Sequence, residues 1–449
     1  MKTKLFVQKD NTMKNKIDYV AAVDIGTTKI VTIIGRKNGH NKLEVLALAK
    51  TPSKGVKRGV VLNIEETVQA IRTTVEEVQA KSGIRFKDVF VGIAGQHIRS
   101  VRNRGYINRD SYETEITRED IYTLLNDMKK IPVEVGEEII HVLPQNFIVD
   151  NEAGVRNPVG MSGKRLEGNF HIVIAQIASA RNMEKCVNRV GLNINQLILE
   201  PLASAEAVLT DDEKEAGVAL IDIGGGTTDL AVFYDSVIRH TAVIPFGGNV
   251  VTNDIKEGCS ILLRQAELLK VQFGSALGDI ANEDKVVTIP GISGREPKEI
   301  SFRSLAYIIQ SRMEEIIDAV MFEIENSGVA DKLSAGVVLT GGGALLKHLP
   351  QLVKFHTGYD VRIGLPNEQL AGDIDQEVNQ PMYSTSVGLL LKGYEYLERM
   401  QETATEKTEI KTEEEEEQVT PEETGGNKNP WDWWKETISK IFEEKDATM

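Results

Sequence analysis

The hydrophobic positions of this chain form short β-branched runs that alternate with segments of helical period. Residues 43–49 have the pattern of a strand, and apolar residues recur at helical spacing over 64–81. The succession returns later as a helix over 180–190, a strand over 195–199 and a helix over 201–209. Strands that alternate with helices predict an α/β fold.

Two segments share one pattern: an apolar run, Asp-Ile-Gly, a turn of Gly and Thr, and a second apolar run. The first, AAVDIGTTKIVTIIG, begins at Ala21, and the second, VALIDIGGGTTDLAVFY, begins at Val218. Each predicts a strand, a tight turn and a strand. One such hairpin is commonly only structural, but the repeat predicts two related lobes that face one ligand.

The two turns have the composition of an anion site. Glycine lets the backbone approach a ligand closely, so successive N–H groups can converge on a phosphate, and threonine adds hydroxyl donors. Asp24 and Asp222 precede the turns and suit Mg²⁺, directly or through water. The residues predicted to contact phosphate are Gly26, Thr27, Thr28 and Lys29 in the first turn and Gly225, Gly226, Thr227 and Thr228 in the second.

A third segment, VVLTGGGALL over residues 337–346, is an apolar strand that runs into three glycines and then a helix-like segment. Gly341, Gly342 and Gly343 would let a flat ring or a phosphate lie against the backbone. Together, the three segments favour a shared ligand site over three unrelated structural turns.

Between about residues 88 and 176 the pattern changes to short strands, one helix over about 117–130 and a Gly-rich loop over 154–168. This stretch separates the Asp24 hairpin from the rest of its lobe. It therefore predicts an inserted subdomain.

Small residues occur in two helical segments, as Ala203, Ser204 and Ala205 and again in STSVGLLLK over 384–392. They would let two helices cross closely, as a hinge between lobes needs. Ordinary core packing would explain them equally well.

Composition narrows the class of protein. The net charge of -15 argues against nucleic-acid binding, which needs a basic surface, although ten Glu and three Lys between Gln401 and Lys428 supply much of the acidity. Cys186 and Cys259 form neither a disulfide framework nor a metal site and fit a reducing compartment. The sequence shows no secretory h-region and no membrane-spanning run. Residues 1–16 have the composition of a disordered leader, or Met13 is the true start.

The segment NPWDWWKETISKIFEEK follows the acidic stretch and carries all three tryptophans of the chain. Tryptophan favours the headgroup region of a membrane, because its ring is apolar and its N–H needs a polar partner. The pattern predicts an amphipathic helix over 429–445 that lies in the membrane interface, with 399–428 as a disordered linker. A helix docked in a protein groove would have the same stripe. The stripe consists of Trp431, Trp434, Ile438, Ile441 and Phe442, with Trp433 beside it.

The motifs, in this order, resemble those of the actin-like ATPase superfamily. Its two phosphate motifs match 24–29 and 222–229, its adenosine motif matches 339–344, and its two connecting helices match 200–209 and 386–390. The resemblance implies a two-lobed actin-like fold with duplicated ribonuclease-H-like lobes. It also implies that ATP and Mg²⁺ bind in the cleft between the lobes.

Two further residue roles follow from that resemblance. In the superfamily, a Glu/Lys pair three residues apart on a helix holds the ribose and base, and Glu267 and Lys270 are similar to it; an exposed ion pair is the alternative. Glu200 begins the first connecting helix, where related ATPases orient the attacking water. A carboxylate that caps the helix is the alternative for Glu200.

Three strings narrow the resemblance to the FtsA family of bacterial cell division proteins: SKGVKRGVVLN at Ser53, HVLPQNFIVD at His141 and NPVGMSGKRLEG at Asn157. This implies a small α+β (SHS2-type) insert, head-to-tail filaments, and binding of the FtsZ C-terminal tail within about 248–327. It also implies recruitment of other divisome proteins at the cytoplasmic face of the plasma membrane, at the septum. Hydrolysis of ATP would be slow at most.

A small-molecule kinase of the same superfamily is the alternative function, but it would need a second substrate pocket with a general-base Asp, and no such constellation is identified. The expected organisation is a leader over 1–16, a first lobe over 17–87 and 177–212, an insert over 88–176, a second lobe over 213–398, a linker over 399–428 and a membrane helix over 429–445.

Overall fold

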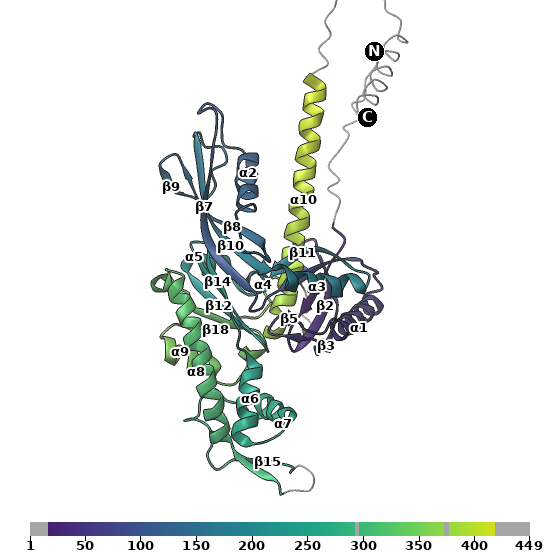
Figure 1. Ribbon diagram of the computed structural model, residues 1–449, viewed down its shortest axis with the longest axis vertical. Coiled ribbons are helices and arrows are strands. Elements are labelled where there is room, and N and C mark those ends of the chain that lie inside the picture. The colour runs from purple at the N-terminus through teal and green to yellow at the C-terminus, as the bar shows by residue number, and fades with distance from the viewer. Residues whose placement is uncertain (1–16, 292–295, 372–376, 418–449) are drawn as a thin grey trace, which may run out of the picture. The chain divides into compact units, whose positions relative to one another are not determined.

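The computed structural model describes residues 17–291, 296–371 and 377–417 of the 449-residue chain. The chain divides into two compact units, Met1–Leu397 and Glu398–Met449. The first unit holds two five-stranded sheets, a four-stranded sheet and their helices (Figure 1). The predicted leader and the predicted membrane helix lie outside the described residues.

The first lobe is a five-stranded sheet in the order β11-β6-β1-β2-β3. Alternate residues of a strand face opposite sides, so Val23 of β1 packs with helices α1 and α3 while Ala22 packs with α4 and with α10 (Ser384–Glu417). The elements are β1 (Val20–Ile25), β2 (Lys29–Lys37), β3 (Leu43–Pro52), β6 (Asp88–Ile93), β11 (Asn193–Leu199), α1 (Ile64–Ser82), α3 (Ile177–Arg189) and α4 (Glu200–Val208).

The second lobe repeats this topology, with strands in the order β14-β13-β12-β17-β18. In each lobe the first strand pairs antiparallel with the next and parallel with a later one, which confirms the predicted duplication. The elements are β12 (Val218–Ile223), β13 (Thr228–Tyr234), β14 (Val237–Ile244), β17 (Val337–Thr340), β18 (Val361–Ile363), α5 (Asp211–Ala216), α6 (Gly248–Cys259), α7 (Leu263–Phe273), α8 (Phe302–Asn326) and α9 (Leu349–Thr357).

The insert is an antiparallel sheet, β7-β10-β8-β9, covered by α2. It has a hydrophobic core of its own, which includes Leu124, Phe147 and Phe170. Its predicted start at 88 is wrong, because β6 pairs with β1 in the first-lobe sheet. A pairing between strands so far apart along the chain leaves no local signal. The elements are β7 (Ile98–Asn108), α2 (Arg118–Met128), β8 (Glu137–Val149), β9 (Glu152–Val155) and β10 (Arg165–Gln176).

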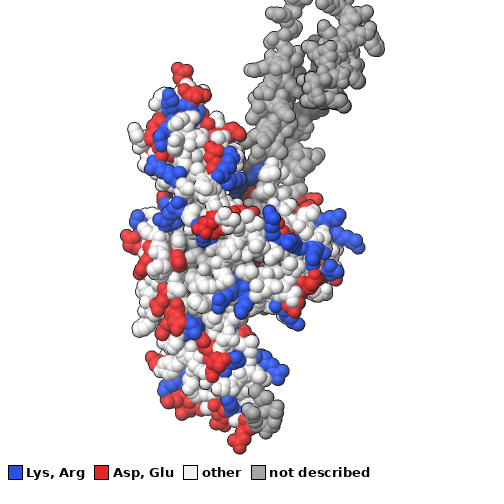
Figure 2. All heavy atoms as spheres, viewed as in Figure 1, with Lys and Arg blue, Asp and Glu red and all other residues white. Residues whose placement is uncertain are grey.

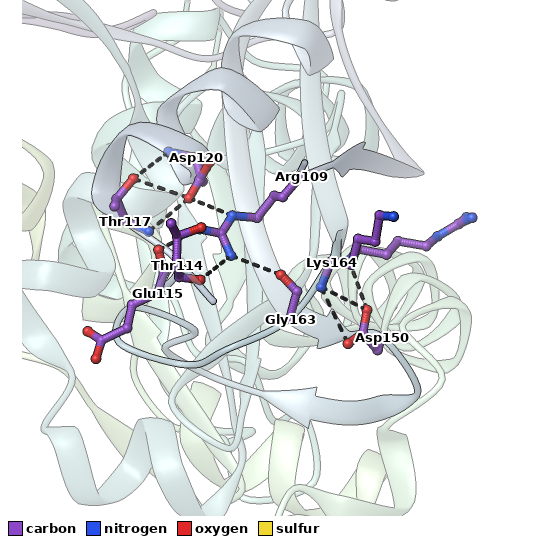
Figure 3. Close-up of polar contacts among 9 residues, drawn as sticks. Arg109, Thr114, Glu115, Thr117, Asp120, Asp150, Gly163 and Lys164 are labelled. Atoms are coloured by element: carbon purple, nitrogen blue, oxygen red, sulfur yellow. Dashed lines mark hydrogen bonds and ion pairs between the residues drawn. The ribbon is translucent and has the colours of Figure 1, made fainter. Parts of the chain in front are cut away.

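Arg109 joins two loops of the insert (Figure 3). Its guanidinium donates to the carbonyls of Thr114 and Gly163, each at 2.9 Å, and pairs with Asp120 at 3.1 Å. Asp120 also belongs to a capping box with Thr117 at the start of α2. The Gly-rich loop is therefore tied to α2 by polar contacts within the insert.

The insert packs on β14 of the second lobe. The Ser100 hydroxyl donates to the Thr241 carbonyl at 2.9 Å, and the Thr241 hydroxyl hydrogen-bonds with Nε2 of His171 at 2.7 Å. Gln145 donates to the Ile238 carbonyl at 3.0 Å. Three strands of the insert thus contact one strand of the second lobe.

The long C-terminal helix α10 (Ser384–Glu417) begins between the two lobes and shares a core with both, through Val387 and Leu390. Residues 399–417 were expected to be a disordered linker, but they are helical, in keeping with their eight Glu residues, which favour helix. In the described part of the chain no helix is long and apolar enough to cross a membrane. The remaining short elements are β4 (Val56–Lys57), β5 (Val60–Val61), β15 (Val286–Ile289), β16 (Lys298–Ser301) and the 3₁₀ turns Ala330–Lys332, Gly342–Leu345 and Pro381–Tyr383.

Candidate functional site

The two predicted phosphate turns face each other. The first follows β1 and the second follows β12, at matching places in the two sheets. A Cβ atom on Gly226 would lie 2.5 Å from the Thr27 hydroxyl, and one on Gly225 would overlap Thr28. Only glycine fits at these two positions while the turns stay in contact. The structure therefore brings together two turns that the sequence separates by about two hundred residues.

The aspartates before the turns are both buried, and consecutive residues at the start of α10 hold them. The Ser386 hydroxyl donates to Asp24 Oδ2 at 2.9 Å, and the Thr385 hydroxyl donates to Asp222 Oδ2 at 3.1 Å. Ser204 of α4 also donates to Asp222 Oδ2, at 2.7 Å. One helix thus contacts the carboxylate of each lobe.

Four carboxyl groups, those of Asp24, Asp222, Asp229 and Glu200, gather around this point, and the charge of Lys29 acts on all of them but Asp229. Burial raises the pKa of Asp24 and of Asp222, and the positive charge of Lys29 acts against the rise in both. Burial, followed by the charge of Asp222, raises the pKa of Asp229 to about 8. Burial and then the charges of the three aspartates raise the pKa of Glu200 well above its usual range. Carboxyl groups whose pKa values are raised by burial and by one another are typical of functional sites.

Lys29 spans from the first turn to the short 3₁₀ turn that precedes α10. Its ammonium group donates to the Met382 carbonyl at 2.6 Å and lies 5.4 Å from the centre of the Tyr383 ring. The phosphate contact of Lys29 stays a prediction, and these contacts link the first lobe to the start of α10.

Glu200 begins α4 and is half-buried. A Cβ atom on Gly92 would lie 3.0 Å from its Cγ, so the absence of a side chain there makes room for the carboxylate. No side chain caps this helix; instead the Leu199 N–H donates to Nε2 of His141 in the insert, at 3.1 Å. The capping alternative for Glu200 therefore finds no hydrogen bond to support it, and its role toward water stays a prediction.

Glu267 and Lys270 form an ion pair of 2.7 Å on α7, and the Lys270 side chain is only 16% exposed. Lys270 also donates to the Gly248 carbonyl at 3.0 Å. The Gly248 N–H in turn donates to the carbonyl of Gly224, at 2.9 Å, at the second phosphate turn. Lys270 is thus linked to the second phosphate turn, while the Glu267 side chain is 47% exposed, so the contact of the pair with ribose and base stays a prediction.

The three glycines of the third segment follow β17. Gly341 has a positive φ of 81°, and a Cβ there would overlap Asp222. A Cβ on Gly343 would press against Ile223, whereas one on Gly342 would meet nothing within 4 Å. Of the three positions, Gly342 therefore offers an open side on which a ligand could lie.

The residues present fit a magnesium ion held by few protein ligands. No group of three or more His, Cys, Asp or Glu side chains arranged for a metal occurs among the described residues. Mg²⁺, however, commonly takes one or two carboxylates and completes its shell with water and phosphate. Asp229 Oδ1 is buried and lacks a hydrogen-bond partner within the described ranges, as an oxygen near a cation would.

Sequence reasoning placed Asp229 and Ser386 inside matched motifs without giving them a role in the site, and it gave none to Thr385. Asp229 directly follows the Gly-Thr turn of the second copy, so its register opposite Asp222 was readable once β12 and β13 were paired. In the sequence, Thr385 and Ser386 could be recognised only as small residues. The carboxylates that their hydroxyls contact lie 163 and 362 residues away along the chain.

Comparison with known families identifies two matching models. The model described as "Cell division protein FtsA" matches residues 219–388, and that described as "SHS2 domain inserted in FTSA" matches 95–174. The second match begins just after β6, in agreement with the strand pairing.

Similar proteins cover most of the chain. The cell division protein FtsA of Pseudomonas aeruginosa is 41% identical over 375 residues, which are 83% of this chain and 89% of that protein. The FtsA of Escherichia coli K12 is 36% identical over 385 residues, 84% of this chain and 90% of that one. Among solved structures, a PilM-PilN type IV pilus biogenesis complex aligns with a TM-score of 0.59 at 17% identity, over 83% of this chain and 98% of that chain. MreB5 of Spiroplasma citri bound to ADP aligns with a TM-score of 0.50 at 15% identity, over 87% and 99%. These two structures show the actin-like fold alone.

Proposed function

Because the chain belongs to the FtsA family of cell division proteins, we propose that it binds ATP with Mg²⁺ between its two lobes and attaches FtsZ filaments to the membrane. The observation that carries the nucleotide part is the junction at α10. There two facing Gly-Thr turns bring their aspartates to the adjacent hydroxyls of Thr385 and Ser386. A ligand that touches both turns would therefore link the lobes.

The turns would supply backbone and hydroxyl donors to the phosphates, Gly342 would face the adenosine, and Glu267 with Lys270 would lie toward the ribose and base. Asp24 and Asp222 would hold Mg²⁺ or its waters, and the ion would offset phosphate charge. Glu200 would orient a water molecule and accept its proton; a raised pKa makes an ionised carboxylate a stronger base. Slow turnover suits a nucleotide that mainly sets the relation of the lobes.

The assembly part of the proposal rests on family membership and on the C-terminal sequence. Head-to-tail contacts that do not close would produce a filament, and the FtsZ tail would bind the second lobe within about 248–327. The stripe of Trp431, Trp434 and their neighbours would lie in the cytoplasmic face of the plasma membrane at the septum. One short helix binds weakly, so a filament that presents many copies would hold firmly. Other divisome proteins would then be recruited to the same place.

Gly342→Asp tests the nucleotide site. A Cβ at Gly342 meets nothing within 4 Å, so the variant should fold normally, while its carboxylate would repel phosphate and fill the adenosine surface. We expect ATP affinity to fall at least about thirtyfold in a fluorescent-nucleotide titration, because an uncompensated like charge costs roughly 2 kcal/mol or more.

Gly39→Asp is the matched control, since a Cβ there also meets nothing within 4 Å and the position lies in the loop before β3. It should bind ATP like the unchanged protein. Equal ATP affinity of the Gly342→Asp variant and the control would refute the assignment of the third segment to the nucleotide.

A further inference from the structure

The turn between β4 and β5 places an arginine where an arginine is strained. Arg58 and Gly59 are its two central residues, with φ of 50° and 74°, between the paired Lys57 and Val60. Two-residue turns with both φ values positive favour Asn-Gly, because a larger side chain at the first position crowds the backbone. Residues kept in such conformations concentrate at functional sites.

The same turn contacts the first phosphate turn directly and reaches a residue that is hydrogen-bonded to the second. The Gly59 N–H donates to the Thr27 hydroxyl at 3.3 Å. The Arg58 guanidinium lies 5.9 Å from the centre of the Phe246 ring, and the Phe246 carbonyl accepts a hydrogen bond from the Thr228 hydroxyl at 2.9 Å. Arg58 therefore reaches from the first lobe to the second beside the turns that face each other.

The turn is also packed tightly in place. A Cβ on Gly59 would overlap the Ala94 carbonyl, and one on Gly95 would lie 2.8 Å from the Arg58 carbonyl. Since β6 ends at Ile93, the turn lies against the end of a central strand of the sheet. The base of the arginine side chain is thus held firmly, while its guanidinium lies over an aromatic ring of the other lobe.

The charge of Arg58 is not used by a carboxylate. None of the ion pairs within 17–291, 296–371 and 377–417 involves it, and the side chain is half-buried. Around the turns the carboxylates outnumber the cations. A nucleotide triphosphate would bring several more negative charges, so its binding there would need further positive charge. A guanidinium is the side chain best shaped to bind a phosphate through two hydrogen bonds.

We propose that Arg58 is a further nucleotide-binding residue, which contacts the terminal phosphate of ATP and so distinguishes ATP from ADP. The inference rests on the proposed ATP site. With ATP, the guanidinium leaves the Phe246 ring and binds phosphate; with ADP, the ring remains its partner. Arg58 thereby makes the contact between the lobes depend on the terminal phosphate.

Arg58→Asn is the decisive variant, measured in the full-length protein by competition of ATP and of ADP against a fluorescent nucleotide. Asn-Gly suits the turn, so folding should be kept or improved while the charge is lost. We expect ATP affinity to fall about tenfold and ADP affinity to change less than about twofold, since a charged hydrogen bond to phosphate is lost only with ATP. Arg58→Lys keeps the charge without the planar guanidinium. Its ATP affinity should lie between those of Arg58→Asn and the unchanged protein.

An ATP-to-ADP affinity ratio that is unchanged in Arg58→Asn would overturn the inference, as would an equal loss for both nucleotides. Asp222→Ala tests the proposed nucleotide site independently of Arg58, because it should lower the affinity for ATP and for ADP together. If the unchanged protein binds neither nucleotide, the proposed function fails and the inference fails with it. If the unchanged protein binds both nucleotides and Arg58→Asn has the same ATP-to-ADP affinity ratio, the proposed site stands and only the role given to Arg58 is wrong.

Discussion

Asp229 is a residue of the candidate site whose burial lowers the stability of the folded protein. It lies opposite Asp222 across β12 and β13 and is 4% exposed. Thr227 donates to Asp229 Oδ2 at 3.0 Å, which only partly offsets its burial. An acid in this position would not be kept for stability, so its presence supports a role in the site.

The raised pKa of Asp229 predicts a pH effect on stability. In the unfolded chain this carboxyl loses its proton near pH 4, but in the folded protein near pH 8. Folding therefore takes up a proton between these values, and the free energy of unfolding falls as the pH rises through this window. Asp229→Asn removes the titration. We expect the unchanged protein to lose about 2 kcal/mol more than the variant between about pH 6 and pH 8, measured by urea unfolding without nucleotide.

Asp110→Asn removes an exposed carboxylate of the insert and serves as the control for this experiment. Its stability should follow the pH as that of the unchanged protein does. Parallel pH profiles for Asp229→Asn and the unchanged protein would show that Asp229 is ionised throughout the range.

At the scale of elements, the crossing of α4 and α10 is the tightest contact of the candidate site. A Cβ on Gly388 would overlap the Ala203 carbonyl. The prediction that small residues let these helices cross closely is therefore confirmed. Whether the crossing is a hinge remains a prediction.

Gly388→Ala should force the two helices apart. We expect a loss of about 1–3 kcal/mol in the free energy of unfolding, typical of overpacking in a tight core, together with weaker ATP binding because Ser204 and Thr385 move with their helices. Urea unfolding and nucleotide titration measure the two effects. In Gly39→Ala the new Cβ meets nothing within 4 Å, so a similar loss in that variant would contradict the packing explanation.

The repeat made the hairpins, their aspartates and the duplicated lobes predictable, because strand, turn and residue chemistry are all encoded locally. The pairing of β6 with β1 was not predictable in this way, and the insert was consequently drawn too large. The partners of Thr385 and Ser386 were also hidden, since a hydroxyl on a helix carries no sign of which distant carboxylate it meets. Local patterns predicted the elements, but the tertiary contacts that complete the site could not be derived from them.

At the scale of the whole molecule, the acidic stretch over 401–428 is followed by the tryptophan-rich segment over 429–445. On the face drawn in Figure 2, Lys and Arg lie interspersed with Asp and Glu. This face therefore offers no broad positive field to attract an anionic membrane. The tryptophan stripe at the C-terminal end of the sequence is therefore the segment to which we assign membrane binding.

Trp434→Glu places a charge in that stripe and should weaken binding to anionic lipid vesicles at least about tenfold in a co-sedimentation assay, because an apolar ring no longer enters the interface. FtsZ should sediment with vesicles only when the unchanged chain is present, and more with ATP than without. Ser439→Glu adds the same charge off the stripe and should reduce binding much less. Equal binding by both variants and the unchanged chain would refute the membrane anchor.

The neighbouring hydroxyls at the start of α10 also limit how this chain can vary. Each residue advances around a helix by about 100°. Thr385 and Ser386 can therefore donate to Asp222 and Asp24 only at one rotation of α10 about its axis. Inserting or deleting a single residue just before them would turn both hydroxyls away from Asp222 and Asp24 at once. Substitutions here would harm one lobe at a time, whereas a length change would disconnect both together. A change in length between Tyr383 and Gly388 should therefore weaken nucleotide binding more than a substitution at Thr385 or at Ser386 alone.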